Sequence, residues 1–209
     1  MTESNLNKAI VYFRVCLASQ SPRRRELLKQ IGVDFEVRPA NIDEQRWNNE
    51  KPYDYVRRIT LTKASTVWQQ PGFPQDMPVL ASDTAVVVDD DVLGKPENEQ
   101  ESVAMLSRLS GRTHQVLTGV GIMFANKREF VSVESEVTFR EISEAEMRHY
   151  WKTGEGRDKA GGYAVQGLAA SFVANINGSF SGVMGLPLFE TSALLQQWRV
   201  AMWLSRPHS

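Results

Sequence analysis

The sequence predicts a mixed α/β fold, with a mixed sheet and flanking helices, in a single domain that spans residues 1–209. Two observations support this prediction. Short apolar runs of strand-like composition alternate with helix-like segments in the first half of the chain, and two long strand-like runs follow each other directly in the second half. No repeat, low-complexity tract or obvious linker divides the chain. At 42% hydrophobic and 23% charged residues, it is typical of globular proteins that bury a substantial core.

The first half of the chain alternates between predicted strands and helices after a polar N-terminal extension of residues 1–9. Ser21-Pro22 is a helix-start signal and Gly32 a helix-stop signal, so a helix is expected between them. The other elements expected here are a strand over Ile10–Ala18, a strand over Val33–Val37, a helix over Tyr53–Trp68 and a strand over Val79–Val88.

The second half contains the predicted hairpins and a glycine-rich stretch. The acidic turn Asp89–Asp91 is expected to fold the chain back onto Val92–Lys95, and Ser143 with Glu146 forms a capping box before a helix of about ten residues. The remaining expected elements are a helix over Asn98–Leu109, strands over Gln115–Phe124 and Phe130–Arg140, a glycine-rich stretch over Gly154–Gly185 with a turn at Asn177-Gly178, and a last helix from Pro187 to near Trp203.

Composition and charge exclude several classes of protein. The net charge of −1 gives no global field toward nucleic acid or an anionic membrane, so any anion site must be local. The run before Ala18 is interrupted by Arg14, and no stretch approaches the ~20 apolar residues of a membrane span. The single cysteine, Cys16, lies in an apolar run and is expected to be buried. We therefore expect a cytoplasmic protein with no nucleic-acid or membrane partner.

Common catalytic motifs are absent from the sequence. It contains neither a P-loop nor a Rossmann glycine motif. The three histidines, His114, His149 and His208, show no metal-ligand spacing and are not paired with a nucleophile motif. Zinc and triad chemistry are therefore unsupported.

A cluster of arginines opens the first predicted helix. Arg23, Arg24 and Arg25 fall in its first turn, where the helix dipole already presents partial positive charge. Together with free backbone N–H groups and the hydroxyls of Ser19 and Ser21, they would form an anion trap that a phosphate could occupy. The alternative is that Ser21 only caps the helix and the arginines pair with surface carboxylates.

A carboxylate also interrupts the apolar run Val79–Val88. Asp83 lies where burial should demand a partner or a metal. With Glu44 it could hold Mg²⁺ through oxygen ligands, or it could deprotonate an attacking water. A third interpretation is that Asp83 bonds to the local backbone at a strand kink.

Two further features extend this candidate site. A hairpin at Asp89–Asp91 would bring Lys95 near Asp83, which allows an Asp–Lys pair beside a phosphate, although Lys95 could equally be an exposed lysine at a strand end. In the glycine-rich stretch, Lys159 and the carboxamide of Gln166 could bind phosphate and read a base edge, but such loops are also common as simple turns.

Four blocks of the sequence, in the same order, closely resemble the Maf family of nucleotide pyrophosphatases. They cover nearly the whole chain after about residue 12, and the ordered set is highly specific although each block alone is weak. The blocks are Leu17–Arg24 with Glu26-Leu27-Leu28, Ala81–Thr84 with Gly94-Lys95-Pro96, Leu109–His114, and Asp158–Gly161 through Gln166-Gly167 to Gly185-Leu186-Pro187.

The resemblance implies a fold shared with inosine triphosphate pyrophosphatases, in which two lobes surround a nucleotide cleft. It also implies hydrolysis between the α and β phosphates with a divalent metal, Mg²⁺ or Mn²⁺. By position, Asp83 becomes the proton acceptor and a metal ligand, and Glu44 becomes a metal-binding acid. The substrate-binding residues implied in the same way are Ser19, Arg23, Arg24, Lys63, Thr84, Lys95, Lys159 and Gln166.

The pattern Tyr163-x-x-Gln166-Gly167, with Arg23 and Thr84, resembles the family branch that acts on dTTP and UTP. The resemblance leaves two alternatives open: a nucleotide-binding regulator of septum formation with little turnover, and a metal-dependent phosphatase of modified nucleotides. Family members are often dimers. Trp198 and Trp203 could serve a dimer interface, although burial in the core of one chain is the expected state of both.

Overall fold

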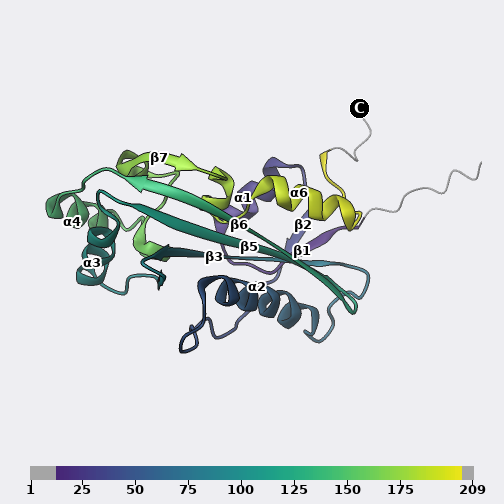
Figure 1. Cartoon of the computed structure of the whole chain (residues 1–209). Helices are drawn as coiled ribbons and strands as arrows, with labels where there is room; N and C mark the ends of the chain where they lie inside the picture. The colour runs from purple at the N-terminus through teal and green to yellow at the C-terminus, as the bar shows by residue number, and fades with distance from the viewer. Residues whose placement is uncertain (1–12, 204–209) are drawn as a thin grey trace, which may run out of the picture.

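The computed structural model describes residues 13–203 of the chain, so the predicted extension over residues 1–9 lies outside the described residues. Its strands and longer helices confirm the mixed α/β class (Figure 1). In chain order the elements are β1 (Val15–Leu17), α1 (Pro22–Gln30), β2 (Phe35–Val37), α2 (Pro52–Trp68), β3 (Val79–Val88), β4 (Asp91–Leu93), α3 (Glu99–Leu109), β5 (Thr113–Phe124), β6 (Lys127–Phe139), α4 (Glu144–Thr153), η1 (Ala160–Gly162), η2 (Leu168–Phe172), β7 (Val173–Asn177), α5 (Phe180–Met184) and α6 (Leu188–Gln197).

One mixed sheet of seven strands organises the molecule, with the order β2-β1-β3-β5-β6-β7 and β4 paired to β3. β1 runs parallel to β2 and β3, whereas β3, β5, β6 and β7 pair antiparallel. β5 pairs with β3 along its whole length, so β1 and β4 share the opposite edge. On that edge of β3, β1 pairs as far as Leu80 and β4 pairs from Val86 onward. The middle of the edge is therefore open to loops and ligands.

The long strands β5 and β6 run through the length of the molecule, with different helices at its two ends (Figure 1). At one end α3 and α4 pack over a core that includes Leu106, Leu109 and Phe139. At the other end α1 and α6 cover a core that includes Leu28 and Leu195. α2 covers the opposite face of the sheet, packing against β3 and β5. The two expected lobes correspond to these two ends.

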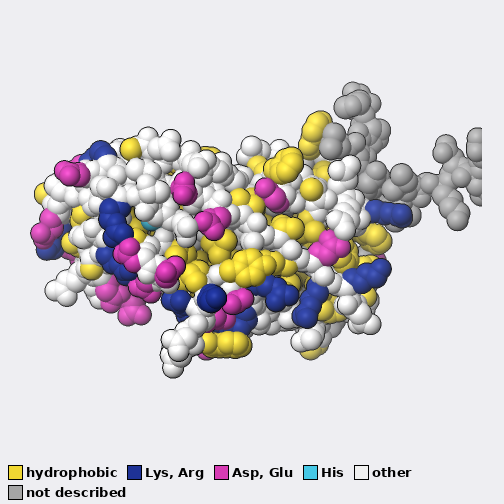
Figure 2. All heavy atoms as spheres, in the orientation of Figure 1, with side chains coloured by type: hydrophobic (Ala, Val, Ile, Leu, Met, Phe, Trp, Pro, Cys, Tyr) yellow, Lys and Arg dark blue, Asp and Glu magenta, His cyan; other side chains and the backbone are white. Residues whose placement is uncertain are grey.

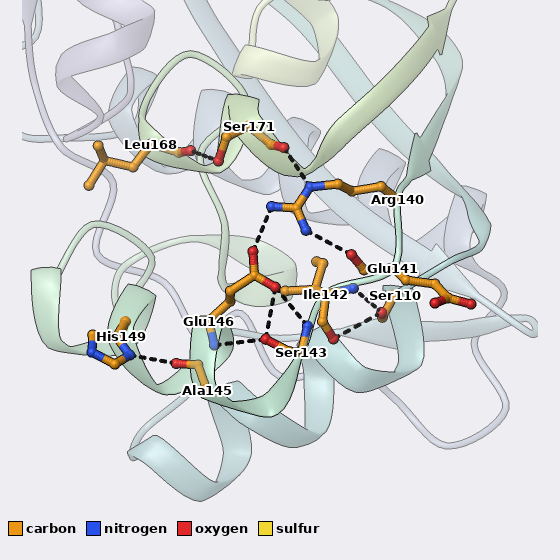
Figure 3. Close-up of polar contacts among 10 residues, drawn as sticks. All are labelled: Ser110, Arg140, Glu141, Ile142, Ser143, Ala145, Glu146, His149, Leu168 and Ser171. Carbon is orange, nitrogen blue, oxygen red and sulfur yellow. Dashed lines mark hydrogen bonds and ion pairs between the residues drawn. The ribbon is translucent and has the colours of Figure 1, made fainter.

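Local signals explain where the helices begin and end. Ser21 caps α1, and Gly32 follows it at φ +69°, a conformation that favours glycine. The capping box at Ser143 and Glu146 is present at the start of α4, and Glu146 also pairs with Arg140 (Figure 3). Both predictions are therefore confirmed. Cys16 is fully buried, as expected.

Three predictions of element boundaries are wrong. The strand predicted over Ile10–Ala18 spans only Val15–Leu17 among the described residues, and Ile10 itself is not described. The last helix ends at Gln197 because the chain then turns, so that Val200 lies opposite Phe13 in an isolated bridge. The glycine-rich stretch contains a strand, β7, which pairs with the edge of β6.

The two tryptophans near the end of the described chain behave differently from each other. Trp198 is partly buried and contacts the ring of Phe124, with centroids 6.5 Å apart. Trp203, which was expected in the core, is 57% exposed. Within residues 13–203, every helix is too short or too polar to cross a lipid bilayer.

Candidate functional site

A cavity of about 830 Å³ opens beside the middle of β3, at the gap between the parts of its edge that pair with β1 and β4. Loops after β1 and β2, helix α2 and the glycine-rich stretch all meet there. Every site residue predicted from the sequence lines this cavity: Ser19, Arg23, Arg24, Glu44, Lys63, Asp83, Thr84, Lys95, Lys159 and Gln166. The structure thus brings together residues that are far apart in the sequence.

Asp83 and Thr84 are neighbours on β3, so their side chains point to opposite faces of the sheet. Asp83 lies on the face that α2 covers and contacts Lys63. Thr84 lies on the face toward α1 and α5, where its hydroxyl oxygen is 3.2 Å from Arg24 Nη2 and 3.1 Å from Thr118 Oγ1. The gap in strand pairing therefore lets one cavity reach both faces.

Lys63 joins the two acids of the site. Its Nζ lies 2.7 Å from Asp83 Oδ1 and 2.9 Å from Glu44 Oε1. Lys63 belongs to the buried stripe of α2, at helical spacing from Ile59 and Val67, and its amine therefore reaches the sheet rather than solvent. Asp83 and Lys63 are only 5% and 7% exposed. The lysine on an apolar helix face and the aspartate in an apolar strand thus neutralise each other's buried charge through an ion pair.

The two acids have opposite pKa shifts. Burial raises the pKa of Asp83 above its usual value, although Lys63 and Arg24 oppose the shift. Burial would also raise the pKa of Glu44, but Lys63, Lys95 and Arg24 together hold it below its usual value. Paired groups with pKa values pushed apart are typical of acid–base sites. Asp83 is the better proton acceptor of the two, and Glu44 the more permanent anion.

Arg24 ties the first helix to the rest of the site. It donates from Nε to the carbonyl of Gly185 at 2.8 Å, and its two Nη atoms reach Ser19 Oγ at 3.3 Å and Thr84 Oγ1 at 3.2 Å. Arg23 donates from Nε to the carbonyl of Met184 at 3.3 Å. Burial lowers the pKa of both guanidinium groups. Arg23 and Arg24 are therefore partly buried and bonded to backbone carbonyls and hydroxyls, rather than to surface carboxylates.

Arg25, the third arginine of the cluster, does not line the cavity. Its Nη2 donates to the carbonyl of Gln20 at 2.9 Å. Two of the three arginines in the first turn of α1, Arg23 and Arg24, thus line the cavity.

The hairpin spacing allowed a pair of Asp83 with Lys95 or an exposed Lys95; in the structure Asp83 pairs with Lys63 and Lys95 is exposed. β4 ends at Leu93, which pairs with Val86, so Lys95 follows the end of the hairpin. It lines the cavity and lowers the pKa of Glu44 electrostatically. The spacing within the hairpin points only to Lys95 as a neighbour of Asp83. The partner in the structure is Lys63, which lies on α2, twenty residues before Asp83 in the chain.

The segment of residues 155–169, called here the Gln166 loop, forms one wall of the cavity. Gly161 donates its N–H to the carbonyl of Gly94 at 2.9 Å, and a Cβ at Gly161 would lie 2.9 Å from Val86, so glycine is needed for this close approach. Lys159 Nζ lies 2.5 Å from Asp158 Oδ1 and 2.5 Å from the carbonyl of Glu155. Gln166 is exposed at a turn in this loop.

The segment of residues 38–51, called here the Glu44 loop, contributes another part of the lining. Arg58 of α2 donates to the carboxylate of Glu50 at 2.6 and 2.7 Å and to the carbonyl of Gln45 at 3.0 Å. Its guanidinium also lies 4.0 Å from the ring centroid of Trp47. The Tyr55 hydroxyl donates to the carbonyl of Glu44 at 3.1 Å. α2 thus positions both Lys63 and the loop that carries Glu44.

The charges around the cavity favour an anion. Its lining holds five cationic side chains, Arg23, Arg24, Lys63, Lys95 and Lys159, against the carboxylates of Glu44, Asp83 and Asp158. The rest of the surface is mixed, and basic and acidic side chains are interspersed over the face shown in Figure 2. The local excess of positive charge therefore distinguishes the cavity in a chain whose net charge is −1.

The cavity offers oxygen donors for a hard cation. Glu44 and Asp83 both reach Lys63, so their carboxylates lie close together. In the described part of the chain, no three or more His, Cys, Asp or Glu side chains gather as a metal site. Mg²⁺ is commonly bound by one or two carboxylates with substrate phosphates and water. The donor set therefore fits a metal that binds together with a phosphate ligand.

Sequence reasoning missed several residues of this region. Tyr55 and Asp158 line the cavity, and Arg58, Glu50, Tyr150 and Glu155 hold its two loops. Asp158 opens the fourth resembling block and could have been included by its charge. The others have no signal in spacing, because each acts through a contact between distant segments.

Comparison with known proteins identifies the family of this chain. The family model described as "Maf-like protein" matches residues 14–198. A protein from Saccharophagus degradans named dTTP/UTP pyrophosphatase is 48% identical over 203 residues, covering 97% of each chain. Proteins of the same name from Hahella chejuensis and Pseudoalteromonas translucida are 46% and 49% identical, covering 91% and 87% of this chain and 94% and 95% of their own. The chain therefore belongs to the Maf-like protein family.

Proposed function

We propose that this protein hydrolyses nucleoside triphosphates, with dTTP and UTP preferred, to the nucleoside monophosphate and pyrophosphate. One observation carries the proposal: a buried Asp83 with raised pKa is paired through Lys63 to Glu44 in a cavity rich in cations. A site that only binds nucleotides has little use for a buried acid among its phosphate-binding groups. The names of the three relatives and the matching motif residues support the same activity.

The triphosphate would bind against the cationic side chains. Ser19 and Arg23, at the start of α1, would hold phosphate oxygens, while Lys95 and Lys159 would neutralise further charge. Arg24 would act mainly by fixing Ser19 and Thr84, to which it is already bonded. Charge that develops on the leaving pyrophosphate would thus be stabilised by groups already in place.

Asp83 would accept the proton of the attacking water. The water oxygen bonds to the α phosphorus, the bond from that phosphorus to the oxygen bridging the β phosphate breaks, and pyrophosphate leaves. Because burial raises the pKa of Asp83, its carboxylate is a stronger base than an exposed aspartate. Lys63 holds Oδ1 at 2.7 Å and keeps the carboxylate oriented.

Glu44 and Asp83 would hold a divalent metal, Mg²⁺ or Mn²⁺, together with the phosphates of the substrate. When bound, such a metal neutralises phosphate charge and lowers the pKa of water. The low pKa of Glu44 keeps its carboxylate ionised for this task. Lys63, which bridges the two acids, would shift toward one of them or toward a phosphate oxygen.

Gln166 and Thr84 would contribute to the choice of base. Gln166 is exposed and lines the cavity, and a carboxamide offers both a donor and an acceptor to a pyrimidine edge. Discrimination by such groups is strong because a wrong base leaves them unpaired.

The experiment that tests this function is a panel of nucleoside triphosphates incubated with the purified protein and Mg²⁺. Monophosphate, diphosphate, pyrophosphate and orthophosphate are resolved as separate products. Monophosphate with pyrophosphate from dTTP and UTP is the expected result. Stepwise release of orthophosphate would instead indicate a phosphatase, and binding without turnover would indicate a nucleotide-dependent regulator of septum formation.

We also propose that the protein works as a homodimer in the cytoplasm, where nucleoside triphosphates are made. Phe180, Phe189 and Trp203 are 50%, 83% and 57% exposed, and large apolar side chains of this kind are often covered by a second subunit. Light scattering on the purified chain tests the proposal, since a monomeric mass over the working concentration range would contradict it.

A further inference from the structure

Gln166 lies in a tight turn of the Gln166 loop. Gly167 donates its N–H to the carbonyl of Ala164 at 3.0 Å, so residues 164–167 form a turn with Gln166 near its tip. Gln166 is exposed, whereas Ala164 and Val165 before it are buried. The backbone on both sides of this turn therefore decides where the carboxamide points.

Tyr150 of α4 fixes the backbone before the turn. Its hydroxyl accepts the N–H of Ala164 at 3.1 Å and donates to Glu155 Oε1 at 2.8 Å. The ring is 4% exposed and packs against Phe172, with centroids 5.4 Å apart. The hydroxyl is thus a rigid bridge from the core to the loop.

Glu155 fixes the backbone after the turn. Its Oε2 accepts the N–H of Leu168 at 2.9 Å, and its Oε1 accepts the N–H of Ala169 at 3.2 Å. Gly167 packs directly on this carboxylate, since a Cβ there would lie 2.2 Å from Glu155 Oε2. The backbone carbonyl of Glu155 also accepts a hydrogen bond from Lys159 Nζ. A single side chain therefore holds three successive residues of the loop.

The Glu155 carboxylate is suited to this role because it is ionised. Burial would raise its pKa, but the N–H of Leu168, the Tyr150 hydroxyl and the N–H of Ala169 hold the pKa below its usual value. Hydrogen bonds to an ionised acceptor are stronger than those between neutral groups. The turn is accordingly clamped on both sides by two linked side chains.

We propose that Tyr150 and Glu155 are positioning residues for base selection, which fix the turn that carries Gln166. The inference rests on the proposed function, because it assumes that Gln166 reads the base. Neither side chain needs to touch the nucleotide. Removing either contact would let the turn move, so that the carboxamide would lose its alignment with the base while the phosphate-binding groups on α1, α2 and β3 would stay in place.

The test compares Tyr150→Phe and Glu155→Gln with the wild-type protein on dTTP, UTP and dCTP. Tyr150→Phe keeps the ring in the core, and Glu155→Gln is nearly isosteric. We expect the preference for dTTP and UTP over dCTP to fall about tenfold in each variant, the scale of one lost hydrogen bond. The loss should appear in KM for dTTP, with kcat within about twofold of the wild-type value.

Glu146→Gln is the matched control. Glu146 is also a glutamate associated with α4 that accepts backbone N–H and pairs with a neighbouring side chain, Arg140 (Figure 3). It lies outside the residues that line the cavity. This variant should lower the thermal midpoint and leave base preference unchanged. An equal loss of preference in Glu146→Gln would show a general effect of weakening α4 and would overturn the inference.

A second comparison tests whether the clamp acts through Gln166. In a Gln166→Ala background, Tyr150→Phe should cause no further loss of preference, because the residue it positions is gone. A further loss of about tenfold there would overturn the inference. Wild-type protein without any base preference would contradict the proposed function and the inference together. A wild-type preference that survives both single variants would contradict the inference alone.

Discussion

The two loops that line the cavity are held in different ways. Every residue of the Glu44 loop is at least partly exposed, and side chains of α2, above all Arg58, anchor it. The Gln166 loop buries about half of its residues and is anchored by Tyr150, Glu155 and the contact of Gly161 with Gly94. The side that would bind metal is therefore built to adjust, whereas the side that would read the base is fixed to the core.

Asp83 lines the same cavity as these two loops, and its replacement should have the largest effect. Asp83→Asn keeps the shape of the side chain but removes the proton acceptor, so turnover of dTTP should fall by about 10²–10⁴. Nucleotide affinity, measured by calorimetry, should stay close to wild type because the cationic walls remain. A variant that retained wild-type kcat would show that Asp83 is not the base.

The core anchoring of the Gln166 loop should make it sensitive to acid through His114. Its Nε2 lies 2.8 Å from the hydroxyl of Tyr163, and burial lowers the pKa of His114 from 6.5 to about 4. The unfolded chain therefore binds a proton more readily than the folded chain. The contribution of His114 is fully present above pH 6.5 and is lost as the pH falls toward 4.

Between about pH 7 and about pH 4, the wild-type protein should lose about 3 kcal/mol more unfolding free energy than His114→Gln. Urea unfolding of both proteins at several pH values gives the difference, in which the shared carboxylates cancel. Parallel curves for the two proteins would mean that His114 has the same pKa in the folded and unfolded chain and is no acid-sensitive anchor.

Gln166→Glu sharpens the comparison on the base-reading side. A carboxylate can accept but not donate when ionised, so one contact to the base should be replaced by a repulsion. We expect kcat/KM for dTTP and UTP to fall roughly thirtyfold, which corresponds to about 2 kcal/mol of lost transition-state stabilisation. Inhibition by inorganic triphosphate should change much less. Equal losses for every base would place Gln166 away from the base.

Arg58→Ala tests the adjustable side and should have the smallest of these effects. Loss of the bonds to Glu50 and Gln45 frees the Glu44 loop, so the Mg²⁺ concentration needed for half-maximal rate should rise about tenfold. Base preference should stay constant. Arg57→Ala, at the exposed neighbouring position on α2, is the matched control. A change in base preference, or equal effects of the two variants, would erase the distinction between the loops.

The elements that the sequence predicts well are those with local signals. The apolar run of β3, the Ser21 cap of α1 and the capping box of α4 all appear where their patterns indicate. β7 was missed because Val173–Asn177 becomes a strand only by pairing with the edge of β6. The end of α6 was misplaced because the apolar residues after Gln197 pack against the core without helical geometry.

The candidate site divides in the same way. Asp83 and the arginines of α1 are anomalies that the sequence displays directly, as a charge in an apolar strand and as cations at a helix N-terminus. The contact of Asp83 with Lys63 could not be read from spacing, because it depends on how α2 packs on the sheet. Tyr150 and Glu155 act through backbone N–H groups of residues 164–169, thirteen or more positions further along the chain, which no residue pattern encodes.

The position of water attack tests the central claim most directly. Hydrolysis of dTTP with Mg²⁺ in ¹⁸O-labelled water, followed by mass spectrometry of the products, shows which phosphorus receives the water oxygen. We predict label in thymidine monophosphate and unlabelled pyrophosphate, because Asp83 would direct the water to the α phosphorus. Label in pyrophosphate, or release of orthophosphate, would contradict the account.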